Sequence, residues 1–260
     1  MKEIIVGFIE KPNINRGLFY GENLFTSFSS FELLLPFLEL HTRRLELGLK
    51  VFYPELEVRQ LIEEAFSEVC SLQGESHTDL YFRLTPLISL CKKQAAIQIN
   101  YREKDHEIVV EKNAVTKKMN WFFTKLNKKT KLGNYHEEFL LLGEINSGGK
   151  NDFVKVDLDN NILEASTSNL FFVKNGEVII PDSRNDILSG IIIKNIEGIR
   201  REVKLDELDS FDECFFTNSV DYIVPVMSIN DKKLSVAENK SKKDLMIKYL
   251  PKIFEVECES

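Results

Sequence analysis

The chain has 260 residues, of which 43% are hydrophobic and 29% charged, close to the average of soluble globular proteins. Its 34 Lys and Arg against 41 Asp and Glu leave a net charge of −7, which argues against a general binder of nucleic acids or membrane surfaces. No run of about 18 apolar residues is present, so a transmembrane helix is excluded, and the charged start is not typical of a signal peptide. Four isolated cysteines favour reduced thiols, and we expect a cytoplasmic protein.

The first hundred residues indicate a small α+β unit. Helices are expected from Pro36, which suits a first helical turn, through Leu49, and from Glu55 to about Leu72, because apolar residues recur at helical spacing. Alternating apolar and polar residues predict strands at Glu3–Glu10, Asn23–Leu35 with a turn near Ser29 and Ser30, Leu80–Leu84, and Ala95–Tyr101.

The stretch from Lys112 to Lys131 is rich in lysine, and we interpret it as a linker followed by an irregular loop. Its lysines either form a solvated face or create a local positive field that attracts a small anionic substrate.

The second half alternates strands and helices. We expect a helix at Tyr135–Ile145, strands at Phe153–Val156, Asn169–Val173 and Val178–Ile180, a helix from Gly190, strands at Glu213–Phe216 and Val220–Val226, and a helix from about Ser241. The sequence therefore predicts an α+β protein of two domains, residues 1–115 and the larger 116–260.

The commonest catalytic signatures are absent. The four histidines are scattered, no zinc-type spacing occurs, and GxSxG, Walker A and GxGxxG motifs are missing, so we expect no metal site. What remains is a set of polar positions at the ends of predicted elements, namely Lys131 before a helix, Glu164 at the end of a strand, Gly190 at a helix start, and Thr217 and Asn218 after a strand. A helix start leaves N–H groups that can hold a phosphate.

Six short motifs occur in an order that is known from one family. They are RGLFYGENLFTS (16–27), HTRRL (41–45), KLGNY (131–135), LEASTSNLF (163–171), LSGI (188–191) and TNSVDYIVPV (217–226). Together they resemble the fold-type IV family of pyridoxal-phosphate (PLP) enzymes, which includes branched-chain and D-amino-acid aminotransferases and 4-amino-4-deoxychorismate lyase. The resemblance implies a two-domain, D-amino-acid-aminotransferase-like fold, PLP as cofactor, and a homodimer.

The resemblance also implies a role for each matching residue. Lys131 would hold PLP covalently, Glu164 would pair with the pyridine nitrogen, and Tyr135 would reach the phenolic oxygen. The phosphate would be bound by Arg44, Gly190, Ile191, Ile192, Thr217 and Asn218. These residue types suit that chemistry, because a lysine amine can act as nucleophile and proton shuttle, and a carboxylate favours the protonated ring.

The sequence departs from the family where Gly190 and Ile191 are followed by Ile192 and Ile193 rather than Thr and Arg.

The expected reaction is a lyase reaction of folate biosynthesis, which converts 4-amino-4-deoxychorismate, a small anionic amine-bearing substrate, to 4-aminobenzoate and pyruvate. The short chain and Phe25-Thr26-Ser27 favour it, with Thr26 as a further catalytic residue. A branched-chain or D-amino-acid transaminase, or a non-catalytic PLP-fold protein, remain as alternatives.

Overall fold

The structure is a computed structural model that describes residues 1–29, 37–104, 112–119, 130–147, 150–182, 187–235 and 242–251. The chain forms two compact units. Unit 1 comprises Met1–His106 and Lys129–Asn134, and unit 2 comprises Glu107–Lys128 and Tyr135–Ser260. The segment around Lys131 therefore belongs to unit 1, although the residues that precede it, Glu107–Lys128, belong to unit 2.

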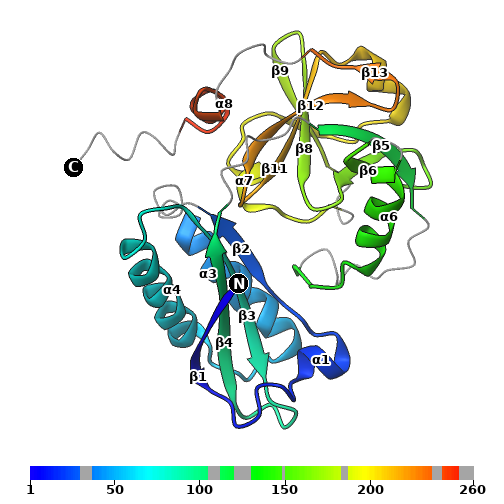
Figure 1. Cartoon of the computed structure of the whole chain (residues 1–260). Coiled ribbons are helices and arrows are strands. Elements are labelled where there is room, and N and C mark those ends of the chain that lie inside the picture. The colour runs from blue at the N-terminus through cyan, green and yellow to red at the C-terminus, as the bar shows by residue number, and fades with distance from the viewer. Residues whose placement is uncertain are drawn as a thin grey trace. The chain divides into compact units, whose positions relative to one another are not determined.

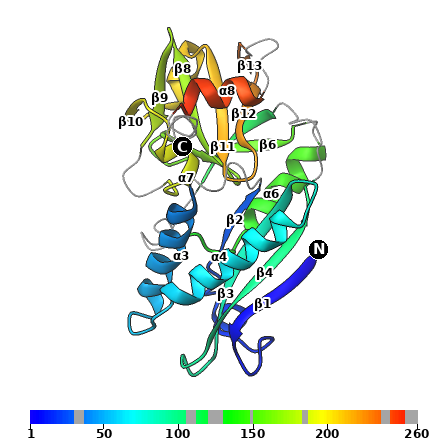
Figure 2. The same ribbon diagram turned by 90° about the vertical axis from the view of Figure 1, so that its left-hand side faces the viewer.

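Unit 1 is a four-stranded antiparallel sheet with two long helices (Figures 1 and 2). The strands are β1 (Lys2–Phe8), β2 (Thr26–Ser29), β3 (Leu80–Ile88) and β4 (Ala95–Glu103), in the order β1-β4-β3-β2. The helices are α1 (Arg16–Tyr20), α3 (Leu38–Phe52) and α4 (Arg59–Gly74). Helix α4 packs on β1 and β4, and α3 packs on α4 and β2, so both long helices cover one face of the sheet.

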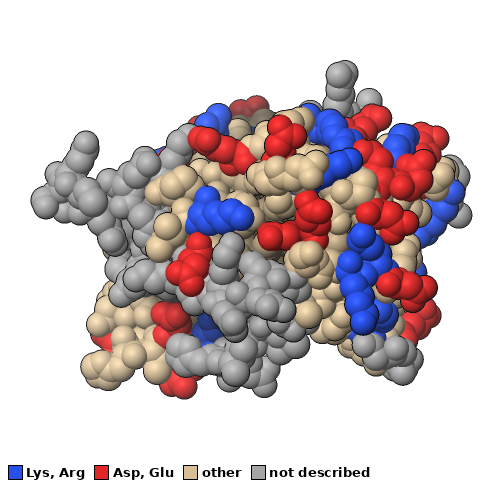
Figure 3. All heavy atoms as spheres, turned by 90° about the horizontal axis from the view of Figure 1, so that it is seen from above, with Lys and Arg blue, Asp and Glu red and all other residues tan. Residues whose placement is uncertain are grey.

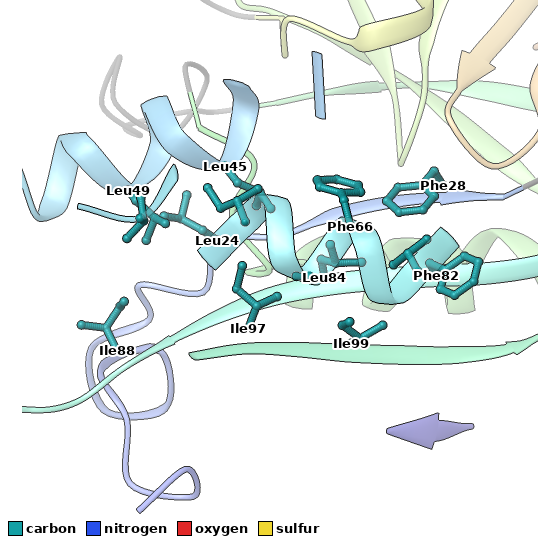
Figure 4. Close-up of a cluster of buried hydrophobic side chains, with 14 of the residues drawn as sticks. Leu24, Phe28, Leu45, Leu49, Phe66, Phe82, Leu84, Ile88, Ile97 and Ile99 are labelled. Atoms are coloured by element: carbon teal, nitrogen blue, oxygen red, sulfur yellow. The ribbon is translucent and has the colours of Figure 1, made fainter. Parts of the chain in front are cut away.

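The core of unit 1 lies between this face and the two helices (Figure 4). Phe28 of β2 stacks on Phe66 of α4 at a ring-centroid distance of 5.7 Å and contacts Phe82 of β3 at the same distance. Each such ring is almost fully buried, which stabilises the fold by roughly 1.5–3 kcal/mol. Strand β2, which begins at Thr26, is thus packed against α4 and β3, and Phe28 also contacts His41 of α3 at a ring-centroid distance of 4.8 Å.

Unit 2 is built on a nine-stranded mixed sheet in the order β10-β9-β8-β11-β12-β5-β6-β7, with β13 paired to β12 (Figure 1). The strands are β5 (Lys112–Lys118), β6 (Asp152–Val156), β7 (Ile162–Ala165), β8 (Asn169–Lys174), β9 (Glu177–Pro181), β10 (Ile199–Arg201), β11 (Glu213–Asn218), β12 (Tyr222–Ile229) and β13 (Lys232–Lys233). Only residues 166–168 connect β7 to β8, although β11, β12, β5 and β6 separate them along the sheet. The sheet must therefore curl back on itself.

The helical elements of unit 2 are α6 (His136–Ser147), α7 (Ile191–Lys194), the 3-10 helix η2 (Leu205–Ser210) and α8 (Lys242–Tyr249). Helix α6 packs on β6, α7 on β8 and β11, and α8 on β12. The core contains stacked aromatic pairs, such as Phe172 and Phe211 at 4.3 Å and Phe171 and Phe215 at 5.0 Å. Much of the chain's high phenylalanine content therefore serves packing.

The structure corrects the interpretation of residues 112–131 in part. Residues 112–118 form β5, which lies inside the sheet between β12 and β6 and pairs with both in parallel. The three lysines of β5 conceal the strand in the sequence: Ala114 is buried, whereas Lys112 and Lys117 are half-buried and Lys118 is exposed. Residues 120–129, Pro36 and the turn expected at Ser30 lie outside the described residues.

Most other expected elements are present with shifted ends. Helix α4 begins at Arg59 rather than Glu55, and β3 continues through Pro86 to Ile88. No helix among the described residues is long and apolar enough to cross a membrane. On the described part of the face in Figure 3, Lys and Arg alternate with Asp and Glu, so no patch of one sign dominates there.

Candidate functional site

The main chain of Lys131 is fixed within unit 1. The Phe25 N–H donates to the Lys131 carbonyl at 3.1 Å, and the Gly133 N–H donates to the Asn23 carbonyl at 2.7 Å. Leu24 and Leu132 form an antiparallel bridge between these two bonds. The segment that carries Lys131 is therefore paired like a short strand with residues 23–25.

Two cationic side chains lie over one aromatic ring beside this segment. The Lys131 ammonium is 5.0 Å from the centroid of the Phe25 ring, and the Arg83 guanidinium carbon is 4.0 Å from it. A side chain at Gly133 would come within 3.0 Å of the Arg83 guanidinium, so glycine leaves room for it. The sequence analysis missed Arg83, because an arginine in a strand normally indicates only an exposed position.

Thr26 is fully buried, and its hydroxyl lies 2.6 Å from Nδ1 of His41 on α3. Burial lowers the pKa of His41 well below its ordinary value of 6.5, and the positive charges of Arg44 and Lys131 lower it further. The imidazole is consequently neutral. Thr26 and His41 form an uncharged hydrogen-bonded pair in a positively charged environment.

Arg44 lies on α3 one turn from His41 and is half-buried, whereas its neighbour Arg43 is exposed. The structure therefore distinguishes the two arginines of HTRRL, and Arg44 is the one whose charge acts on the buried histidine.

A second charge cluster holds the turn before β2. Arg16 donates two hydrogen bonds to the Glu22 carboxylate at 2.7 and 2.8 Å, and the Tyr53 hydroxyl donates to the same carboxylate. The Arg16 hydrogen bonds lower the pKa of Glu22. Gly21 between them has φ +69°, which favours glycine, and its carbonyl accepts a bond from the Asn134 side chain at 3.4 Å. The RGLFYGEN motif thus supports the partner strand of the Lys131 segment.

In unit 2, Glu164 on β7 has both carboxylate oxygens engaged. Oε2 accepts hydrogen bonds from the Leu188 N–H at 3.0 Å and from Asn169 Nδ2 at 3.3 Å, while Oε1 lies 3.7 Å from the Lys155 ammonium. Lys155 on β6 also forms a buried ion pair with Glu138 on α6 at 2.9 Å. Lys155 and Glu138 were not predicted, because they lie 17 residues apart on different elements. Asn169 was not assigned a role either, although it stands in the LEASTSNLF motif five residues from Glu164.

Gly190 precedes the four-residue helix α7 and is buried against Asn169. Ile191, Ile192 and Ile193 are all buried, at 3%, 1% and 5% exposure. Ile192 and Ile193, which stand where the family often has Thr and Arg, are therefore packed in the apolar interior.

Thr217 and Asn218 differ in their surroundings at the end of β11. Among the described residues, the Thr217 hydroxyl is one of two buried side-chain atoms that have no hydrogen-bond partner. Asn218 is instead used in the turn, since its Oδ1 accepts from the N–H groups of Val220 and Asp221 at 2.8 and 2.7 Å. Tyr135 is half-buried just before α6, with its ring 6.3 Å from that of Phe139.

These residues fit PLP. A buried hydroxyl without a partner at Thr217 is costly unless a ligand atom satisfies it. Glu164 is a partly exposed carboxylate with a fixed orientation, as a partner for a ring nitrogen requires. Within the described ranges, no group of His, Cys, Asp and Glu could hold a metal ion, and the described cysteines, Cys70, Cys91 and Cys214, are free thiols.

Comparisons with known proteins agree with this fold. The branched-chain-amino-acid aminotransferase of Pseudomonas aeruginosa is 26% identical over 110 residues, which cover 39% of this chain and 36% of that protein. The chain spans about a third to a half of the length of the curated relatives that it matches.

Two solved structures share the fold across nearly the whole chain. A branched-chain aminotransferase from Thermoproteus uzoniensis has a TM-score of 0.74 at 19% identity, covering 99% of this chain and 96% of that one. A putative 4-amino-4-deoxychorismate lyase from Legionella pneumophila has a TM-score of 0.69 at 20% identity, covering 92% and 93%. The model of the family "Amino-transferase class IV" matches residues 23–229. The chain therefore belongs to the class IV aminotransferase family, whose enzymes depend on pyridoxal phosphate.

Proposed function

We propose that this protein is a PLP-dependent lyase that converts 4-amino-4-deoxychorismate to 4-aminobenzoate and pyruvate. The observation that carries the proposal is the neutral Thr26–His41 pair in a region of unit 1 that holds Arg44, Lys131 and Arg83. A substrate with two carboxylates suits that positive environment, whereas an acidic residue at position 26 would repel it. The structure from Legionella pneumophila that is described as a putative 4-amino-4-deoxychorismate lyase has the same fold, which supports the proposal.

PLP, when bound, supplies an electron sink for the bond-breaking steps. Lys131 is proposed to hold the cofactor covalently, with its main chain fixed by residues 23–25. The Lys131 amine, when free, would take the proton from the amine-bearing carbon of the substrate. The C–O bond between the ring and the enolpyruvyl group would then break, and the departing oxygen would take up a proton, which gives pyruvate and the aromatic 4-aminobenzoate.

The remaining residues are proposed to bind and orient. Glu164 would keep the ring nitrogen protonated, and Tyr135 would interact with the phenolic oxygen. Arg44, the backbone of Gly190, Ile191 and Ile192, and the Thr217 hydroxyl would hold the phosphate. The Asn218 Nδ2 donates to Ser168 Oγ at 3.0 Å and to Asp221 Oδ2 at 3.4 Å, so a phosphate contact at this residue would come from its main chain. Arg83 is a candidate for a substrate carboxylate, because its guanidinium lies over Phe25 beside Lys131.

Product analysis of the PLP-loaded protein tests the reaction. Incubation with 4-amino-4-deoxychorismate should release 4-aminobenzoate and pyruvate in equal amounts, and Thr26→Val should lower that rate about tenfold, equivalent to about 1.4 kcal/mol of barrier. Thr42→Val removes another buried hydroxyl from α3 and serves as the control. Borohydride reduction and peptide mapping should place the cofactor on Lys131; another lysine would contradict the site.

Branched-chain transamination is the second candidate. It is favoured by the names of the curated relatives, which are branched-chain aminotransferases. Exchange of amino groups between branched-chain amino acids and keto acids, without any 4-aminobenzoate from the chorismate derivative, would select it.

A homodimer is also proposed. The exposed apolar side chains of α1, Leu18, Phe19 and Tyr20, at 67%, 58% and 61% exposure, support it. Light scattering on the purified protein measures the mass directly, and a monomer of 30.1 kDa would contradict it.

A further inference from the structure

Unit 2 contains a buried lysine between two carboxylates. The Lys155 side chain is 8% exposed, and its ammonium lies 2.9 Å from Glu138 Oε1 and 3.7 Å from Glu164 Oε1. The Glu138 side chain is 9% exposed and the Glu164 side chain 16%. All five residues of β6 are buried, so this strand position would normally hold an apolar side chain.

Burial of three charged side chains in one cluster carries a free-energy penalty, so such a cluster is expected to have a functional role. Transfer of charges out of water carries a penalty of several kcal/mol per ion, and well-packed apolar residues of similar volume are often at least as stabilising. The ionised side chains of Glu138, Lys155 and Glu164 together carry one net negative charge. Glu164 is the most exposed of the three side chains, and the orientation of its carboxylate is fixed by the Leu188 N–H and the Asn169 side chain.

We propose that Glu138 and Lys155 are positioning residues that set the charge presented by Glu164 to the ring nitrogen of PLP. This inference rests on the proposed role of Glu164 in the cofactor site. Without Glu138, the positive charge of Lys155 would offset the negative charge of the Glu164 carboxylate. The carboxylate would then stabilise the protonated ring nitrogen less. Glu138 offsets Lys155, so the cluster retains the single negative charge that balances one protonated ring.

The proposal predicts a rescue that a purely structural role does not. Glu138→Gln keeps the shape and leaves Lys155 paired with Glu164, but it makes the cluster neutral. Adding Lys155→Met restores the single negative charge on Glu164 and leaves no buried cation. PLP affinity should fall about tenfold in the single variant and return to within about threefold of wild type in the double variant.

Two measurements test this without reference to turnover. NMR of the protein loaded with nitrogen-15-labelled PLP reports the protonation of the ring nitrogen, and absorbance titration of the apoprotein gives the PLP affinity. Glu137→Gln, at an exposed position of the same helix, is the matched control for loss of one negative charge. The resonance should move toward the deprotonated form in Glu138→Gln, stay unchanged in Glu137→Gln, and return in the double variant.

The variants distinguish a failure of this inference from a failure of the proposed site. If Glu164→Gln leaves the nitrogen resonance unchanged, the site assignment is wrong and the inference falls with it. If Glu164→Gln shifts the resonance while Glu138→Gln matches Glu137→Gln, only the role of Glu138 and Lys155 is overturned. A shift in Glu138→Gln that the double variant does not reverse would show a packing effect and would also overturn it.

Discussion

The two units hold the side chains that we propose to be functional by different means. In unit 1, the Lys131 segment is fixed by main-chain hydrogen bonds to residues 23–25. In unit 2, Glu164 is fixed at its side chain, by two donors on one oxygen and the Lys155 cation near the other. An amine that must form and release a covalent link benefits from a firm main chain and a long side chain, whereas a carboxylate that stays beside a ring benefits from a fixed carboxyl group.

Removal of Lys155 should break the arrangement in unit 2 most strongly. In Lys155→Met the buried Glu138 loses its cation, and the free energy of unfolding should fall by about 3–5 kcal/mol. Urea denaturation of the apoprotein measures this, provided that the transition is two-state. Most of the loss should return in Lys155→Met/Glu138→Gln. Equal stability of Lys155→Met and wild type would show that the buried pair carries little energy.

Arg44→Ala tests the phosphate role proposed for unit 1. A charge-assisted bond to phosphate contributes about 1.5–3 kcal/mol, so PLP affinity should fall about 10–150-fold. Arg43→Ala is the matched control, because Arg43 is exposed on the same helix. PLP titration followed by absorbance measures both variants. Equal affinities in the two would place the phosphate away from α3.

Thr217→Val should change stability and affinity in opposite directions. The valine removes a buried hydroxyl that lacks a partner, so the apoprotein should gain about 1–2 kcal/mol of unfolding free energy. The same change removes a proposed phosphate contact, and PLP affinity should fall about fivefold to tenfold. Denaturation without PLP and titration with it measure the two effects. A variant that gains stability yet binds PLP normally would exclude this hydroxyl from the phosphate site.

His41 gives unit 1 a smaller, pH-dependent contribution. Since burial lowers the pKa of His41 below 6.5, the unfolded chain binds a proton there that the folded chain does not. The stabilisation is therefore present above about pH 6.5 and lost as the pH falls, by about 1 kcal/mol at pH 5.5 relative to pH 7.5.

Comparison of variants isolates the contribution of His41 to the pH dependence of stability. His41→Gln should show a flatter decrease of stability between those two pH values, while His77→Gln, at an exposed histidine, should follow wild type. Parallel curves for all three proteins would mean that His41 does not titrate differently in the folded state.

Local patterns predicted the elements that have a clear period and the residues that belong to a local motif. The helices α3, α4 and α6 and the strands β3, β4, β8 and β11 follow from apolar spacing. Lys131, Glu164, Gly190 and Thr217 were predicted as site residues because each stands in a short motif at an element end. Strand β5 was not predicted, because three of its seven residues are lysines and only Ala114 is buried, so it shows no apolar alternation.

The sequence by itself determined the family, its cofactor and the lysine expected to carry it, because those depend on residues that keep fixed spacings within short segments. Only the tertiary structure decided which unit holds the Lys131 segment, which of Arg43 and Arg44 is half-buried, and that Lys155 lies between Glu138 and Glu164. A buried charge is acceptable only with partners, and its partners come from whichever strands and helices meet around it. The spacing of residues within one segment does not predict which segments pack together, and therefore does not predict these partners.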